Sequence, residues 1–405
     1  MKVYLDHAAT SPIKKEVLTA MMPYLTDNFG NPSSVHGWGR DARVAVDSSR
    51  AKIASFLGAQ ASEIIFTSGG TEADNLAVTG LISSQLQINK TQKPHIITSQ
   101  IEHHAVLRSC EKLEKSGLAE VTYIKPNLDG VVSVEDIKNA IKPNTVLVSV
   151  MYVNNEIGTV QPISEIGKMI KQINQLRIDN SKLGSGKIYF HTDAVQATEY
   201  QEMNVDYLHV DLLSLSSHKI GAPKGTGALY IRKNTPVMAL MYGGEQELNM
   251  RAGTENVAGI VALAQAIELV KRQKPKLHQL EVLRNYFVAK VLVEIPETEL
   301  NGSVKFRSPN NANFYFAYIE GESILMNLDL VGIAASSGSA CTSLSLQPSH
   351  VIMAVYDEAE RAHGSIRFTL STGNNKAEID YVIENLKTIV KKLRAMSPLA
   401  PKGYK

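Results

Sequence analysis

The sequence contains little cysteine: Cys110 and Cys341 are the only two cysteines in 405 residues. Two cysteines do not make a disulfide framework, and no CxxC pair or Cys/His cluster has the spacing of a metal site. We therefore expect reduced thiols and no bound metal.

Long apolar runs are lacking too. The longest extends from residue 257 to Val270 and contains Gln265 and Glu268. It is too short and too polar to span a bilayer, so a buried helix explains it better. The N-terminal residues MKVYLDHAAT lack the apolar core of a signal peptide. These absences predict a soluble cytoplasmic protein without membrane contact.

Neither sign of charge is in excess. The chain has 42 Lys and Arg residues against 40 Asp and Glu residues, a net charge of +2, and no block of like charge. This balance gives no electrostatic reason to expect direct binding to nucleic acid. With 44% hydrophobic residues the chain can bury a large core, and its length favours two or three domains.

Short apolar, β-rich runs alternate with helical patterns over the first 255 residues, which predicts an α/β domain with a mainly parallel sheet. The expected strands are 64–67, 95–99, 121–124, 146–151, 188–192, 210–215 and 228–231. The expected helices include 71–88, 104–116, 134–141 and 163–177. Ser11 before Pro12 predicts the start of another helix.

The pattern changes after about residue 255. Two long helical stretches, 255–272 and 277–294, precede a mixed α+β region. We therefore expect a large domain at 15–258 and a smaller domain formed by residues 1–14 and 259–405.

The segment TSGGTEADN (67–75) lies where an apolar strand gives way to a helix. Its glycines allow a tight turn with exposed backbone N–H groups, and Thr71 opens the helix, an arrangement that favours phosphate binding. Taken alone, the segment is explained as well by a plain glycine-rich turn.

Asp193 ends the apolar strand within HTDAVQ (191–196), at the edge of the sheet where ligands of α/β proteins bind. A carboxylate there can keep a heterocyclic nitrogen protonated, or it can cap the next turn. Lys219 follows the next strand, so it is either an exposed loop charge or a lysine that forms a Schiff base. Ser216 and His218 beside it can donate hydrogen bonds to a phosphate.

Cys341 lies in SSGSACTS (336–343), where five of the eight residues are Ser or Thr. Such a polar segment cannot bury itself, whereas cysteine is normally among the most buried residues. Cys341 is therefore either an accidental exposed thiol or a functional one. Cys110 lies among apolar residues of the predicted helix 104–116, and we expect it in the core.

Two further motifs carry polar side chains. IEHHAV (101–106) places His103 and His104 after the strand 95–99; one of them could stack on a flat ring, and the two could equally form a surface pair. No carboxylate at helical spacing completes a zinc site. Arg367 lies in the apolar run SIRF, where either a substrate carboxylate or a structural salt bridge would satisfy its charge.

A phosphate turn, a stacking histidine, an acid and then a lysine follow one another as in fold-type-I enzymes that depend on pyridoxal 5′-phosphate (PLP). The chain resembles the cysteine desulfurases of the NifS/IscS type nearly from end to end, in particular the group with a long SSGSACTS loop. The resemblance is carried by YLDHAAT (4–10), FGNPSS (29–34), TSGGTEADN, EHHAV (102–106), VNNEIG (153–158), DAVQ (193–196), SSHKIGAPKGTGALY (216–230), RAGT (251–254), EGES (320–323), SSGSACTS and AHGSIRF (362–368).

The resemblance implies a mainly parallel seven-stranded sheet in the large domain and a cysteine loop at about 334–346 in the small α+β domain. It also implies the cofactor contacts. Lys219 would form the internal aldimine with PLP, Asp193 would pair with the pyridinium nitrogen, and Gln196 would pair with the ring hydroxyl. His103 would stack on the ring and transfer protons. The phosphate would be held by Gly70, Thr71, Ser216 and His218.

The same resemblance implies a homodimer in which Thr254 reaches the phosphate of the neighbouring subunit. Asn155 would contact the cofactor and, with Arg367, bind the carboxylate of the substrate L-cysteine. Cys341 would take the sulfur as a persulfide and leave alanine. The sulfur would then pass to an acceptor protein of iron–sulfur cluster assembly or tRNA thiolation.

Two alternatives stay open at this point. The first is another fold-type-I reaction, such as selenocysteine lyase or aminotransfer; Cys341 in its serine-rich segment argues against aminotransfer. The second is a non-catalytic subunit that binds sulfur carriers, against which Lys219, Asp193 and His103 argue. The short C-terminus SPLAPKGYK (397–405) leaves the identity of the sulfur acceptor open.

Overall fold

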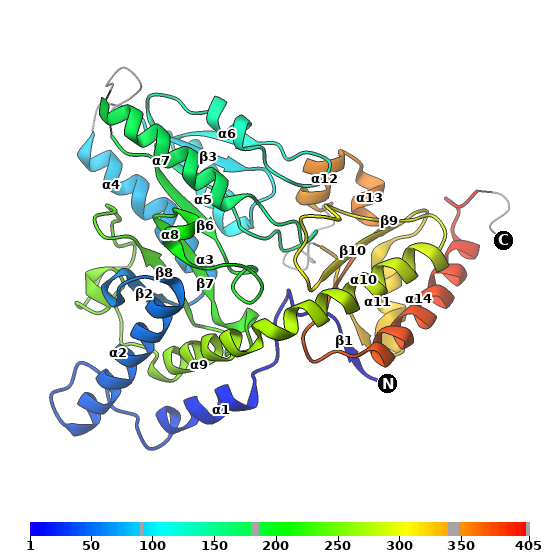
Figure 1. The fold of residues 1–405 in the computed structure, drawn as a ribbon, viewed down its shortest axis with the longest axis horizontal. Coiled ribbons are helices and arrows are strands. Elements are labelled where there is room, and N and C mark those ends of the chain that lie inside the picture. The colour runs from blue at the N-terminus through cyan, green and yellow to red at the C-terminus, as the bar shows by residue number, and fades with distance from the viewer. Residues whose placement is uncertain (90–91, 180–185, 339–347, 402–405) are drawn as a thin grey trace.

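A computed structural model describes residues 1–89, 92–179, 186–338 and 348–401 (Figure 1). A seven-stranded sheet with the order β2-β8-β7-β6-β5-β3-β4 forms the centre of its larger part. The strands are β2 (Ile64–Thr67), β3 (His95–Ser99), β4 (Glu120–Ile124), β5 (Thr145–Ser149), β6 (Tyr189–Asp193), β7 (Leu212–Ser216) and β8 (Gly227–Ile231). Only β8 runs antiparallel to its neighbours β7 and β2, which confirms the predicted mainly parallel sheet.

The large sheet is buried on both faces, as parallel sheets usually are. In β2, for example, Ile64 and Phe66 contribute to one core and Ile65 to the other. Apolar residues of α2 (Gly37–Leu57), α6 (Val134–Asn139), α7 (Ile163–Asp179) and α9 (Val257–Gln273) complete the first core. The second core contains α3 (Gly70–Asn75), α4 (Leu81–Ile88) and α5 (His104–Lys115). Cys110 of α5 is fully buried there, which confirms the expectation of a core cysteine.

Two local expectations differ from the structure. The predicted helix 71–88 contains a π-helical turn at Leu76–Gly80, between α3 and α4. The prediction that Ser11 starts a helix is wrong, because α1 begins at Lys15. Ser11 is engaged elsewhere: its backbone N–H donates to His218 O at 2.9 Å, and its hydroxyl donates to Lys219 O at 3.2 Å.

A smaller three-stranded antiparallel sheet has the order β12-β10-β9. Its strands are β9 (Thr298–Leu300), β10 (Asn311–Phe316) and β12 (Ser365–Thr369). Phe287, Phe314 and Phe368 pack edge to face or tilted at its centre. The helices of this part are α10 (Leu277–Glu294), α11 (Gly321–Leu330), α12 (His350–Tyr356), α13 (Ala359–His363) and α14 (Lys376–Met396).

The N-terminal segment lies between the two parts of the molecule (Figure 1). Its strand β1 (Val3–Tyr4) pairs in parallel with β11 (Ile333–Ala334), and Asp6 forms a bridge with Thr369. The chain then continues into α1 (Lys15–Met21), which packs on α9 in the larger part. Helix α9 packs in the core of the larger part, and α10 packs in the core of the smaller part. The domain boundary at residue 258 stays a prediction.

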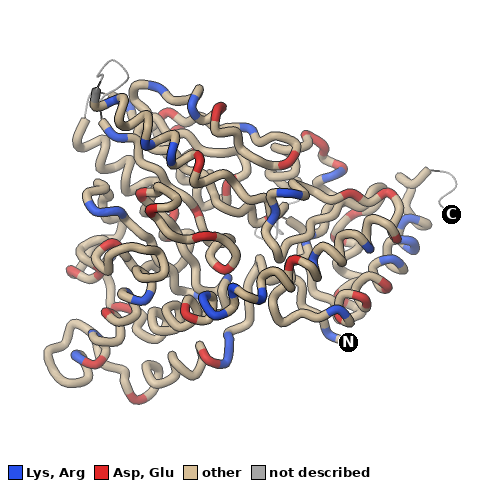
Figure 2. Tube along the Cα trace, viewed as in Figure 1, with Lys and Arg blue, Asp and Glu red and all other residues tan. Residues whose placement is uncertain are grey.

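Basic and acidic residues are interspersed over both parts of the molecule (Figure 2). In the stretches that the structure describes, no helix is both long and apolar enough to cross a membrane.

Candidate active site

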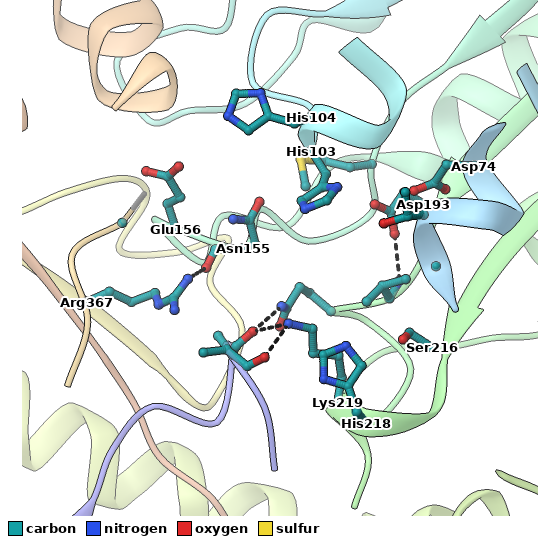
Figure 3. Close-up of a pocket in the computed structure, with 18 of the residues that line it drawn as sticks. Asp74, His103, His104, Asn155, Glu156, Asp193, Ser216, His218, Lys219 and Arg367 are labelled. Carbon is teal, nitrogen blue, oxygen red and sulfur yellow. Dashed lines mark hydrogen bonds between the residues drawn. The ribbon is translucent and has the colours of Figure 1, made fainter. Parts of the chain in front are cut away.

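A cavity of about 340 Å³ lies at the carboxyl ends of the central strands (Figure 3). Strands β6 and β7 end at Asp193 and Ser216, and the loop after β5 brings Asn155 to the same place. This is the edge at which open α/β sheets bind their ligands. The structure brings together ten residues singled out in the sequence: Gly70, Thr71, His103, Asn155, Asp193, Gln196, Ser216, His218, Lys219 and Arg367.

Lys219 reaches into the cavity from a short 3₁₀ turn directly after β7. Its ammonium group donates hydrogen bonds to the backbone oxygens of Ala8 at 2.6 Å and Ala9 at 2.8 Å (Figure 3). Gln196 also contacts this N-terminal segment, through a 2.9 Å bond from Nε2 to Ala8 O. The segment at residues 8–9 therefore forms one wall of the site and orients both side chains.

Asp193 is almost fully buried at the end of β6. Its Oδ1 accepts a 2.9 Å hydrogen bond from the backbone N–H of Val195. Burial raises the pKa of this carboxyl to about 6, although the Val195 N–H and the positive charge of Lys219 both act to lower it. A cationic ring nitrogen placed beside Asp193 would favour its ionised form further.

His103 caps the N-terminus of α5: its Nδ1 accepts a 3.1 Å hydrogen bond from the backbone N–H of Ala105. Burial, reinforced by the charge of Lys219, lowers the pKa of His103 to about 4. The ring is therefore neutral at pH 7. Because Nδ1 serves as an acceptor, the proton of the neutral ring lies on Nε2.

Arg367 is 2% exposed, on strand β12. It donates to the backbone oxygen of Asn155 at 2.7 Å and forms a 3.0 Å ion pair with Asp6. Its Nε is buried without a hydrogen-bond partner among the described residues. The side chain thus has the structural salt bridge, and the interpretation that it binds a substrate carboxylate stays a prediction.

The glycine-rich turn meets the ends of β6 and β7 at very close range. A Cβ atom added to Gly70 would lie 2.7 Å from a methyl group of Val195, so only glycine fits this position without a shift. Ser216 is buried beside it, and Nδ1 of His218 lies 3.2 Å from Oγ1 of Thr10. Burial, with the positive charge of Lys219, lowers the pKa of His218 to about 4.

Sequence reasoning assigned no role to several other residues of the cavity. Asp74 and Glu156 are almost fully buried in its lining, and the ring of His350 lies 4.6 Å from that of His104, one of the two stacking candidates. Asp74 and Glu156 belong to the motifs TSGGTEADN and VNNEIG, so the signal was present in the sequence. Their burial depends on contacts with distant strands and could not be predicted from the motifs.

One predicted residue, Thr254, does not join this group. Thr254 is exposed and lies outside the lining of the cavity as the described residues form it. Cys341 lies outside the described residues. However, Gly338 and His350, on either side of the segment 339–347, both line the cavity.

Comparison with known proteins gives consistent results. The model of the aminotransferase class-V family matches residues 3–382. A cysteine desulfurase IscS of Dictyoglomus turgidum is 50% identical over 98% of this chain and 96% of its own length. A cysteine desulfurase IscS of Methanosarcina thermophila is 48% identical over 100% of this chain and 95% of its own length.

Solved structures agree with these relatives. A NifS-like protein superimposes with a TM-score of 0.87 at 32% identity, covering 97% of this chain and all of that one. The structure described as SspA in complex with cysteine has a TM-score of 0.77 at 36% identity, covering 91% of this chain and 99% of that one.

Proposed function

Because this chain belongs to the aminotransferase class-V family and is a cysteine desulfurase, we propose that Lys219 carries its PLP cofactor and that Cys341 receives the sulfur of L-cysteine. The observation that supports this most directly is the position of Lys219 in one cavity with Asp193, His103 and Arg367. Gly338 and His350 line the same cavity, and they lie on either side of the segment that contains Cys341.

The side chains of the cavity fit PLP. The turn at Gly70 and Thr71, with Ser216 and His218, would hold the phosphate; Asp193 would face the ring nitrogen, and Gln196 the ring hydroxyl. His103 would cover one face of the ring, and Asn155 would contact the ring as well. When bound, PLP withdraws electrons from the Cα of an amino acid and so makes its proton easier to remove.

Lys219 is the residue that would remove this proton, since its Nζ already lies at the cavity wall. His103 is neutral at pH 7 and holds its proton at Nε2, so it can give a proton to a reacting group and regain one afterwards. Lys219 would therefore act as the base, and His103 would act as the acid.

The substrate would be held by its carboxylate. Arg367 is already paired with Asp6, yet its Nε is buried without a partner among the described residues. An unsatisfied buried donor is costly, and a carboxylate is a good acceptor for it. Asn155 lies against Arg367 through its backbone oxygen, and its side chain would provide a second contact.

Cys341 would act as the nucleophile. Its thiolate would attack the sulfur of the bound cysteine, and the bond between that sulfur and Cβ would break. The products are a persulfide on Cys341 and, after protonation of the remaining three-carbon unit, alanine. An acceptor protein of iron–sulfur cluster assembly or tRNA thiolation would then take the outer sulfur.

A homodimer is part of the proposal. Thr254 is exposed and lies outside the cavity lining of its own described chain, which agrees with a role at the phosphate of a neighbouring subunit.

The test uses L-cysteine labelled with radioactive sulfur, without reductant, and measures protein-bound sulfur and released alanine. Wild type and Cys110→Ala should both acquire label and form alanine. Cys341→Ala should lose the label and most of its alanine production. Alanine production by Cys341→Ala at the wild-type rate would contradict the role of Cys341. Turnover of L-selenocysteine alone, with none of L-cysteine, would favour a selenocysteine lyase.

A further inference from the structure

The lining of the cavity contains a buried carboxyl group that the proposed reaction does not use. Asp74, on α3, is 1% exposed and lines the cavity close to Asp193 (Figure 3). One side-chain ligand atom from each of Asp74, His103 and Asp193 lies within 4.8 Å of the other two. Two buried carboxyl groups at this range cannot both carry a negative charge at low cost.

One basic side chain next to Asp74 carries no charge to balance an anion. This is His191, whose Nε2 lies 3.7 Å from Oδ1 of Asp74. His191 is fully buried between Ser149 and Ser214, at 2.8 and 3.0 Å from their hydroxyls, and burial lowers its pKa to about 3. His191 is therefore neutral and holds its orientation through two serine hydroxyls.

A third acid lies nearby. Oε1 of Glu102 accepts hydrogen bonds from Ser99 at 2.6 Å and from the Met151 backbone N–H at 2.9 Å, but its Oε2 is buried without a partner in the described chain. Burial raises the pKa of Glu102 to about 8, so this group is also largely protonated at pH 7. Lys219 is a cation close enough to this group of acids to lower the pKa of Asp193.

Asp74 itself has one oxygen without a donor. Oδ1 is buried and, within the part of the chain that the structure describes, has no hydrogen-bond partner. A carboxylate oxygen in that position would be unsatisfied, and its negative charge would lie close to that of a second carboxylate. A protonated carboxyl removes both problems, because its O–H becomes a donor for the neighbouring acceptor. Burial first, and the carboxyl of Asp193 second, raise the pKa of Asp74 well above its ordinary value.

We infer that Asp74 is a positioning residue that keeps the proton of this acid pair and directs it toward Asp193. Asp193 thereby remains the ionised member and the one that faces the ring nitrogen of the cofactor. This inference rests on the proposed function for the role of Asp193, but the protonation of Asp74 itself does not require bound cofactor.

Two substitutions of Asp74 should have different effects. Asp74→Asn keeps a neutral side chain of the same size with an N–H donor, so it should retain the support for Asp193. Asp74→Leu has a similar volume but no donor, so it should leave the Asp193 carboxylate without that partner.

The decisive experiment is performed on cofactor-free protein labelled with ¹³C at the aspartate carboxyl carbons. At pH 7 the wild-type spectrum should contain a neutral aspartic acid. This signal should vanish in Asp74→Asn and persist in Asp193→Asn. A wild-type spectrum without a neutral aspartic acid, or a neutral signal that survives in Asp74→Asn, would overturn the inference. Neither outcome depends on whether the protein turns over cysteine.

A second measurement tests the consequence for the cofactor. PLP is titrated into each cofactor-free variant and its affinity is read from the visible absorbance. Asp74→Asn should bind within about threefold of wild type, whereas Asp74→Leu should bind about tenfold more weakly or worse, as expected for the loss of one buried hydrogen bond. Equal binding by the two variants would contradict the donor role. If Asp74→Leu does not fold, the labelled wild type and Asp74→Asn still decide the question.

Discussion

The hydroxyl of Ser349 donates a 2.5 Å hydrogen bond to Oε2 of Glu156, although the two residues are 193 positions apart. Gly338 packs so closely on the same carboxylate that a Cβ atom added there would clash with Oε2. The residues on either side of the segment 339–347 therefore meet at one buried carboxylate. Glu156 fixes the two points between which the chain carries Cys341.

We predict that Ser349→Ala lowers the free energy of local opening of α12 by more than the loss of a helix cap would. The hydroxyl of Ser349 also accepts from the Ile352 N–H, which caps this helix. Loss of the cap should cost about 1 kcal/mol, and loss of the donor to a buried carboxylate about 1–3 kcal/mol more. Native-state hydrogen exchange of α12 measures the change in the free energy of local opening.

The matched control is Ser133→Ala. Ser133 is exposed and caps α6 through a 3.2 Å bond from the Asp136 N–H, the same capping arrangement as that of Ser349. Only the capping loss of about 1 kcal/mol is expected in α6. Similar losses in the two helices would show that the bond to Glu156 contributes nothing.

Sodium borohydride should fix the cofactor irreversibly on Lys219. Reduction of the purified holoenzyme, followed by digestion and mass spectrometry, should place the pyridoxyl group on the peptide that contains Lys219. Lys224→Arg is the control, since Lys224 lies in the same connection between β7 and β8 but is exposed, and this change should not alter the labelling. Labelling at Lys224, or at another lysine, would refute the assignment.

Acid should destabilise the cofactor-free protein partly through His95. This ring is fully buried in β3, where Nδ1 lies 2.7 Å from Thr145 Oγ1 and Nε2 lies 2.8 Å from Thr122 Oγ1. Burial, aided by the positive charge of Lys142, lowers its pKa from 6.5 to about 4. The unfolded chain therefore binds the proton more tightly, so the contribution of His95 to stability is complete above pH 6.5 and decreases as the pH falls toward 4.

The substitution His95→Gln tests this pH dependence. A glutamine side chain is neutral at every pH, and at this position it could still donate to one threonine and accept from the other. The melting temperature of His95→Gln should fall less steeply than that of wild type between pH 6.5 and 4. His278→Gln, which changes an exposed histidine of α10, is the control for a general effect of removing a histidine. An unchanged slope in His95→Gln would contradict the prediction.

The two cysteines should differ strongly in reactivity. Cys110 is fully buried in α5, and burial, reinforced by Glu102, raises the pKa of its thiol. Iodoacetamide should therefore leave Cys110 unmodified in the native protein and modify it after unfolding, because the thiolate is the reactive form. Peptide mapping before and after addition of urea measures this. Rapid modification of Cys110 in the native protein would contradict its position in the core.

The strands were predictable because their pattern is local. The apolar runs 64–67 and 95–99 coincide with β2 and β3, and the order of motifs along the chain predicted which strand ends carry Asp193 and Lys219. The π-helical turn at Leu76–Gly80 has no comparable signature in its composition.

The errors and omissions have a common physical cause. Ser11 looked like a helix cap because serine before proline has that local preference, but hydrogen bonds to His218 and Lys219, more than 200 residues away, determine its position. A carboxylate close to a glycine turn, such as Asp74, is ordinary until β6 places Asp193 close to it. Long-range contacts of this kind cannot be read from the spacing of residues.

The anchoring of the N-terminal segment also constrains how the protein is made. The backbone N–H of Ala8 bonds to the side chain of Thr369, 361 residues later, and β1 pairs with β11. At 5–20 residues per second, a ribosome needs on the order of 20–70 s to produce that partner after Ala8 has been added. The larger sheet can form during this interval, but the wall that holds Lys219 cannot be completed until Thr369 has been made.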